Sequence, residues 1–126
     1  MSRPETDLII INGVPVPAPD AGYKILETTN VNAGRNANGV VVGQVVGRNL
    51  WKIDGLSWGQ LTPEQWKSLK QALKPFYVPV TFTDDYNKRR TLIMYPGDRE
   101  SMPYHVENLS FRAFKECKFN LIDTGR

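Results

Sequence analysis

The clearest structural signals in the chain lie in LTPEQWKSLKQALKPFYVPVTF, residues 61–82. Thr62 is a typical N-cap residue, Pro63 suits the first helical position, and Gln65 stands where it completes a capping box. Apolar side chains then recur at helical spacing on one face: Trp66, Leu69, Leu73 and Phe76. We predict one amphipathic helix over about residues 63–74. Because so short a helix is marginal alone, it needs a sheet to cover.

The segments after the helix alternate between apolar and polar residues, which is typical of half-buried strands. Pro75 ends the helix, and residues 78–82 and 90–95 are predicted to form a hairpin around a turn at 84–88. Two further alternating runs close the chain: Leu109, Phe111 and Ala113, then Cys117, Phe119 and Leu121. A bulge is expected between these runs, within residues 114–118.

The same reasoning predicts shorter strands upstream of the helix. Residues 8–11 are rich in isoleucine and turn at Asn12-Gly13, a strong hairpin signal, into an extended run over 14–17. Further strands are predicted over residues 23–29, 40–46 and 48–53. The apolar phase then shifts at Gly55, as a β-bulge would produce.

Together these elements predict an α+β fold that is mainly antiparallel β: a β-sandwich or open barrel with one flanking α-helix. Residues 1–126 are expected to form a single domain. Residues 1–7 are polar and are expected to fray. The segment 30–39 is rich in Asn and Gly, so we expect a mobile loop. Such a loop either orders against a neighbouring subunit or is a plain surface loop.

Composition excludes several classes of protein. The net charge of +3 is spread along the chain, which favours a solvated surface over strong nucleic-acid binding. A single cysteine, Cys117, leaves no intrachain disulfide and no thiolate metal cluster, and its place in an alternating run favours burial. No apolar run reaches the ~18 residues of a membrane span. We expect no membrane contact and synthesis in a reducing host cytoplasm.

No arrangement of side chains predicts catalysis, a cofactor or a metal site. His105 is the only histidine, so it has no partner imidazole for a metal triad or a general-base network. Asp84 and Asp85 are expected to bond backbone N–H groups in a turn. The three tryptophans could line a ligand cleft, but their positions on strand and helix faces favour core packing. A cell-wall hydrolase needs an acid–base pair in a cleft, so we expect a protein that is not an enzyme.

Charged residues at predicted loops and turns are the candidates for contacts between subunits. They are Arg35, Lys88, Arg89, Arg90, Asp98 and Arg99. A cation that meets a carboxylate across an interface forms a strong, charge-assisted hydrogen bond. The Asp98-Arg99 pair follows a turn, where it either clamps a strand end internally or pairs with a neighbouring subunit. The sequence leaves both roles open.

A series of short motifs runs through the chain from about residue 10 to residue 123. They are Ile11-Asn12-Gly13-Val14, Ala33-Gly34-Arg35 with Gly39, Gly47-Arg48, Trp51-Lys52-Ile53, Leu61-Thr62-Pro63-Glu64, Thr81-Phe82-Thr83-Asp84, Thr91, Tyr95, Gly97-Asp98-Arg99 and Phe119-Asn120-Leu121-Ile122. In order and spacing they resemble a small family of tail proteins from bacteriophages and prophages of Gram-positive bacteria. The chain departs from that family before Gly97, where Val is more usual, and in its longer N-terminal lead.

The resemblance implies a non-enzymatic structural component of a viral tail, similar in plan to tail tube and distal tail ring proteins. Such proteins build rings from a β-sandwich or barrel flanked by one helix. A homo-oligomeric ring of hexamer-type symmetry is therefore implied, located in the tail of the virion. The protein would assemble into such a ring or lie at the tail tube–baseplate junction, in contact with other tail proteins, and packaged DNA would pass through the ring. The alternative is a head–tail completion protein or another basic protein that contacts nucleic acid, supported by the sequence pI of about 9.1 and by Lys88-Arg89-Arg90.

Overall fold

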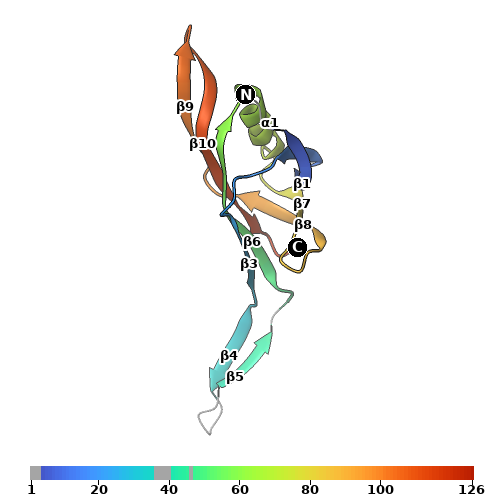
Figure 1. Ribbon diagram of the computed structural model, residues 1–126. Coiled ribbons are helices and arrows are strands. Elements are labelled where there is room, and N and C mark those ends of the chain that lie inside the picture. The colour runs from blue at the N-terminus through green and yellow to red at the C-terminus, as the bar shows by residue number, and fades with distance from the viewer. Residues whose placement is uncertain (1–3, 36–40, 46) are drawn as a thin grey trace.

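The computed structural model describes residues 4–35, 41–45 and 47–126. In chain order its elements are β1 (Glu5–Ile11), β2 (Val14–Pro17), β3 (Lys24–Thr28), β4 (Val31–Arg35), β5 (Val41–Val45), β6 (Leu50–Leu61), α1 (Pro63–Ala72), β7 (Val78–Thr83), β8 (Arg89–Pro96), β9 (Glu100–Glu107) and β10 (Ser110–Asp123) (Figure 1). One eight-stranded sheet has the order β2-β1-β7-β8-β10-β6-β3, with β9 paired to β10. All its pairings are antiparallel and the sheet is open. The predicted fold class, mainly antiparallel β with a single helix, is confirmed.

The sheet curls, so strands that are far apart in its order face each other across the core. Trp51 on β6 and Phe82 on β7 meet edge to face with ring centroids 6.3 Å apart, although β8 and β10 separate these strands. At the open seam, the indole N–H of Trp58 donates to the carbonyl of Pro17 at 2.8 Å. A backbone hydrogen bond of 2.7 Å also joins Asp20 to β6. These bonds hold the β2 edge close to β6 without closing the sheet.

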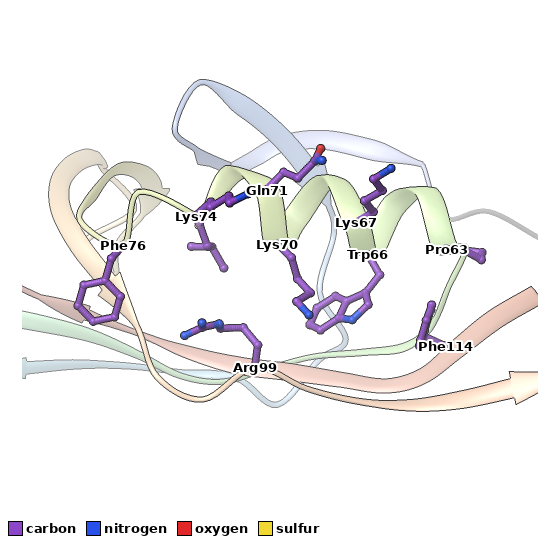
Figure 2. Close-up of a pocket in the computed structure, with 10 residues that line it drawn as sticks. Pro63, Trp66, Lys67, Lys70, Gln71, Lys74, Phe76, Arg99 and Phe114 are labelled. Atoms are coloured by element: carbon purple, nitrogen blue, oxygen red, sulfur yellow. The ribbon is translucent and has the colours of Figure 1, made fainter. Parts of the chain in front are cut away.

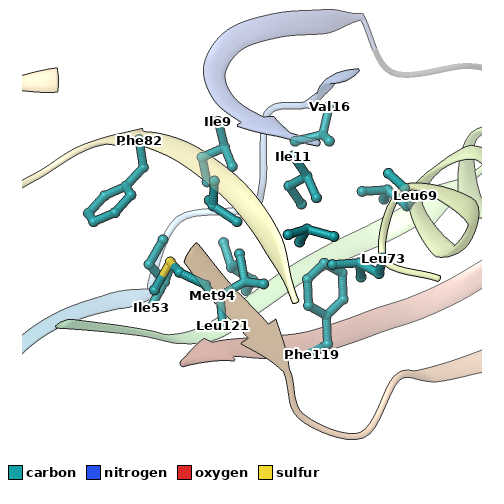
Figure 3. Packing of buried hydrophobic residues seen from close by; sticks show 14 of the residues in the cluster. Ile9, Ile11, Val16, Ile53, Leu69, Leu73, Phe82, Met94, Phe119 and Leu121 are labelled. Carbon is teal, nitrogen blue, oxygen red and sulfur yellow. The ribbon is translucent and has the colours of Figure 1, made fainter. Parts of the chain in front are cut away.

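The core lies inside the curled sheet and under the helix (Figure 3). Alternate residues of five strands supply most of it, because successive side chains of a strand point to opposite faces. Its largest fully buried side chains include Trp58, Phe82, Ile9, Ile11, Ile53, Leu56, Leu61, Leu69, Met94 and Leu121. Each stabilises the fold by about 1.5–3 kcal/mol. All three tryptophans and Cys117 are buried, as predicted.

The capping signals placed the start of the helix correctly. The hydroxyl of Thr62 accepts from the N–H of Gln65 at 3.2 Å, and the Gln65 side chain accepts from the N–H of Thr62 at 3.3 Å. Helix α1 ends at Ala72, two residues before the predicted end, with Leu73 as its C-cap. The helix covers β10, β2 and β6 with its apolar face.

Phe76 is a correction to the predicted apolar face. The helix has already ended before Pro75, so Phe76 lies beyond it with a φ of 73° and a side chain that is 39% exposed. A bulky residue rarely adopts a positive φ. Its ring stacks on Tyr95 with centroids 5.4 Å apart, outside the core.

Both predicted β-bulges are present. Between its pairings with Leu121 and Phe119 of β10, strand β6 has one extra residue. Gly55 lies in this bulge with a φ of 75°, a conformation that suits glycine. Strand β10 has an extra residue opposite β9 inside the predicted 114–118 segment, where Glu116 has a φ of 51°.

Three segments differ from their predictions. Residues 31–35, expected in a mobile loop, form β4 and pair with β5. Residues 36–39 of that predicted loop, and residues 40 and 46 of the strand predicted after it, lie outside the described residues. Residues 5–7, expected to fray, begin β1, where Glu5 and Thr6 pair with β2. Residues 1–3 of the same predicted segment lie outside the described residues. Residues 100–107, for which no strand was predicted, form β9. In each case pairing with a neighbouring strand outweighs weak local propensity.

Two hairpins project from opposite ends of the body, as Figure 1 shows. The first is β4–β5, which forms its own two-stranded sheet. The second is β9 with the first half of β10, whose second half enters the body beside β6 and β8. The body itself therefore needs neither hairpin tip for its sheet.

Candidate functional site

The β9–β10 hairpin ends in a tight turn that exposes an apolar side chain. Asn108 and Leu109 both have a positive φ, 50° and 66°, as in the two-residue turns that match the twist of paired strands. Asparagine tolerates this conformation, whereas leucine rarely adopts it. Leu109 is 99% exposed. An ion pair between Glu107 and Arg112 joins the two strands just behind the turn. The turn thus holds a leucine in solvent at the far end of the molecule.

The sides of the same hairpin also carry exposed apolar residues. Met102, Val106 and Phe111 are between 43% and 69% exposed. Strand β9 pairs on one side with β10, and no described strand pairs with its other edge. An exposed edge strand beside apolar side chains is typical of a surface that contacts another protein. Sequence analysis missed this surface because β9 itself was not predicted.

The predicted contact residues at the β7–β8 turn bond within their own subunit. Arg89 donates to two backbone carbonyls of β1, at 2.5 and 2.6 Å. Arg90 donates from Nε to Asp84 Oδ2 at 2.9 Å, and its guanidinium lies 4.5 Å from the centre of the Trp51 ring. Lys88 is exposed. The guanidinium groups of Arg89 and Arg90 therefore hold strand ends together within the subunit. A role of Lys88, Arg89 and Arg90 in contacts between subunits stays a prediction.

Asp84 organises this turn, as the sequence predicted. Its Oδ1 accepts from the backbone N–H groups of Tyr86 and Lys88 at 2.9 and 3.0 Å. Burial on its own raises the pKa of Asp84. The two backbone hydrogen bonds and the bond from Arg90 together outweigh burial, so the pKa lies below its usual value.

A second buried carboxylate, Asp123, was not predicted from the sequence. Arg48 binds it with both guanidinium nitrogens, at 2.5 and 2.7 Å. The backbone N–H groups of Trp51 and Gly125 add bonds of 3.1 and 2.9 Å. Burial raises the pKa of Asp123, but the bonds from Arg48 and the backbone outweigh it and leave the pKa lowered. No local pattern could have linked Arg48 to a residue at the far end of the chain.

The remaining predicted contact residues lie in two separate places. Arg35 is the last residue of β4, and its side chain is outside the described part of the structure. Asp98 is exposed in the connection from β8 to β9. Arg99 donates from Nη1 to the carbonyl of Gly97 at 3.0 Å, and no ion pair joins it to any described carboxylate. The six predicted residues are therefore not brought together into one site.

Arg99 lines a groove beside α1 with a volume of about 550 Å³. Its lining combines apolar side chains, which we call the floor, with cations, which we call the rim. Floor residues are Trp66, Leu73, Phe76 and Phe114, and rim cations are Lys67, Lys70, Lys74 and Arg99. Figure 2 shows Arg99 below the helix, facing the side from which Lys70 descends. The lysine spacing was visible in the sequence, but the approach of Arg99 depends on the tertiary fold.

Comparison with models of known families, with curated proteins and with solved structures finds no match to this chain. The resemblance to phage tail proteins therefore stays a prediction. Function has to be inferred from the projecting hairpins and the groove.

His105 and Cys117 are the other residues whose side chains could carry chemistry. His105 is exposed beside the Tyr104 ring, at a centroid distance of 3.9 Å. Burial raises the pKa of the Cys117 thiol to about 11, so it stays protonated at neutral pH. No group of three or more potential metal ligands lies among the described residues. Within the same residues, no helix is long and apolar enough to cross a membrane.

Proposed function

We propose that this protein is a non-enzymatic structural subunit of a phage or prophage tail, assembling into a ring or at the tail tube–baseplate junction. The observation that carries the proposal is the projecting β9–β10 hairpin, with Leu109 99% exposed at its tip. Burying a leucine side chain is worth about 1.5–3 kcal/mol. Contact with a second subunit would supply the burial that its own subunit does not.

The arrangement of the hairpins supports a head-to-tail contact between subunits. The two hairpins leave opposite ends of one body (Figure 1), so in an assembly each would reach a different neighbour. Contacts between unlike surfaces build closed rings when the rotation between subunits closes. The resemblance to ring-forming tail proteins supplies the expected hexamer-type symmetry, the partners among other tail proteins and the location in the virion.

Sedimentation velocity over a range of concentrations tests this assembly. Leu109→Asp should weaken self-association by about tenfold or more, because it places a charge in a buried contact. Its melting temperature should stay close to that of the wild type, since the side chain touches little in its own subunit. Val14→Asp, at a side chain that is 37% exposed on the body, is the matched control and should self-associate normally.

A wild-type protein that stays monomeric at high concentration would contradict the proposal. So would its absence from purified virions by mass spectrometry. Unchanged self-association of the Leu109 variant would remove the hairpin tip from the contact.

A protein that contacts nucleic acid is the second candidate. The observation in its favour is the set of rim cations, which make no ion pair with any described carboxylate. The Lys88-Arg89-Arg90 cluster supports nucleic-acid binding less, because Arg89 and Arg90 form hydrogen bonds within the subunit. Phosphate contacts give an affinity that falls steeply between about 50 and 200 mM salt. Absence of DNA binding at low salt would exclude it.

A further inference from the structure

We propose that the groove beside α1 binds an acidic segment of a partner protein, with one large apolar side chain of that segment seated on the aromatic floor. This inference goes beyond the contact proposed for the β9–β10 hairpin and does not depend on it. The proposed ligand carries carboxylates on either side of an apolar side chain. The carboxylates match the cations of the rim, and the apolar side chain matches the floor.

The rim of the groove is positively charged. Elsewhere in the described structure, five cations form ion pairs within the chain: Arg48 with Asp123, Lys52 with Asp54, Arg90 with Asp84, Arg112 with Glu107 and Lys118 with Glu100. Exposed lysines that form no ion pair with a described carboxylate, such as Lys24 and Lys88, also lie elsewhere, but they do not line the groove. The four rim cations have no such partner in the described structure. Like charges gathered around one concavity repel each other and focus a positive potential into it. Carboxylates of a ligand would relieve that repulsion and form charge-assisted hydrogen bonds.

The floor of the groove offers partly exposed aromatic rings. Phe76 keeps a positive φ of 73° while its ring borders the groove, and 39% of its side chain is exposed. Phe114 is only partly buried, and its ring packs edge to face with Phe111 at 5.7 Å. A purely anionic ligand would leave these rings in water, and a neutral apolar ligand would leave the cations unpaired. Only a ligand with both features satisfies both parts of the groove.

The size of the groove limits what it can bind. A volume of about 550 Å³ is in the range of pockets that enclose a small ligand or a few side chains. The cations line this hollow from two sides (Figure 2). The helix and the turn after it carry the three lysines, and the connection from β8 to β9 carries Arg99. A nucleic-acid duplex would touch the rim with its phosphates and leave the floor empty. The geometry therefore favours a peptide segment.

Fluorescence anisotropy with a labelled peptide tests the inference. The probe is a peptide of about 12 residues made of Asp and Glu around a central Phe-Leu pair. The Lys70→Gln/Arg99→Gln double variant should weaken binding by about tenfold or more. The control, Lys24→Gln/Lys88→Gln, removes the same charge from exposed positions away from the groove and should change binding by less than about twofold.

Two further measurements separate the parts of the groove. A peptide with Ser in place of the Phe-Leu pair should bind about tenfold more weakly, because the floor loses its anchor. Phe76→Ser should weaken binding of the original peptide by about fivefold, and it serves as the second variant if the double variant melts early. Self-association through Leu109 should be unchanged in both groove variants, which separates this inference from the proposed assembly.

Several results would overturn the inference. Equal weakening by the groove and control variants would show attraction by net charge alone. Equal binding of the Ser peptide would show an anion site without an apolar anchor. Tighter binding of single-stranded DNA of about 20 nucleotides than of the peptide would assign the groove to nucleic acid. No binding of the peptide at about 1 mM would leave the groove without the proposed occupant.

Discussion

Two buried carboxylates fix the ends of strands in this protein. Asp84 holds the turn between β7 and β8, and Asp123 ties the C-terminal end of β10 to the start of β6. Each accepts backbone N–H groups as well as an arginine, so its lone pairs are satisfied inside the fold. The pKa of each carboxyl is lowered on folding, despite burial. Asp84 links residues within one turn, whereas Asp123 links two segments that are far apart in the sequence.

The lowered pKa values predict a loss of stability in acid. As the pH falls, the unfolded chain binds protons first, near the ordinary aspartate pKa of about 3.9. The stabilisation from Asp84 and Asp123 is therefore fully present above that pH and is lost as the pH falls through the lower folded pKa values. Urea unfolding at a series of pH values from about 7 to 3 should show this decline.

Asp123→Asn tests the share of one carboxylate in that decline. It should cost about 1.5–3 kcal/mol at pH 7, because Arg48 loses its charged partner, and the variant should lose less stability than the wild type on acidification. Asp85→Asn, at an exposed neighbour of Asp84, is the control and should match the wild type. An acid profile of the Asp123 variant identical to that of the wild type would contradict this role.

At the scale of elements, the helix and the central strands could be predicted because their signals are local. The capping box at Thr62 and the shift of apolar phase at Gly55 each depend on a few neighbouring residues. The strands β4 and β9 could not be predicted in this way. Most residues of β9 are exposed, so its burial pattern lacks the alternation that marks a half-buried strand. Its strand conformation comes from hydrogen bonding to β10.

The site was less predictable than the fold for the same reason. The helix lysines could be read from the sequence, but the groove needs Arg99 and Phe114 from other elements. The contacts of Arg89 with the carbonyl of Leu8 on β1 and of Arg90 with the Trp51 ring on β6 also join separate strands. Charge at a turn shows where a contact could form, whereas partners depend on tertiary structure.

Packing of α1 on the sheet makes a prediction at the element scale. Leu73 is 4% exposed and belongs to the core under the helix, so Leu73→Ala should cost about 2–5 kcal/mol through loss of burial and a cavity. Lys67→Ala, on the exposed side of the same helix, should stay within about 0.5 kcal/mol of the wild type. Urea unfolding followed by tryptophan fluorescence measures both. A loss below about 1 kcal/mol for the Leu73 variant would contradict the packing.

At the scale of the whole molecule, the β4–β5 hairpin extends from the body between the end of β3 and the start of β6. These two strands pair directly, with Thr28 opposite Leu50, and the Thr29 hydroxyl donates to Asn49 Oδ1 at 2.8 Å where the chain leaves the body. Strands β4 and β5 pair with no other described strand. Replacing residues 31–46 with a turn of about four residues would therefore convert β3 and β6 into an ordinary hairpin.

The shortened protein should fold and melt as the wild type does. Its sheet, its helix and the Arg48–Asp123 pair are all retained, and closing a shorter loop favours folding by about 1 kcal/mol. Differential scanning calorimetry should show one cooperative transition at or slightly above the wild-type temperature. Self-association, by contrast, should weaken, because one of the two projecting hairpins is lost.

Arg35→Ala is the milder companion variant, and it should weaken assembly while leaving the melting temperature nearly unchanged. Early or non-cooperative melting of either variant would show that this hairpin stabilises the body, and its proposed role between subunits would then fail.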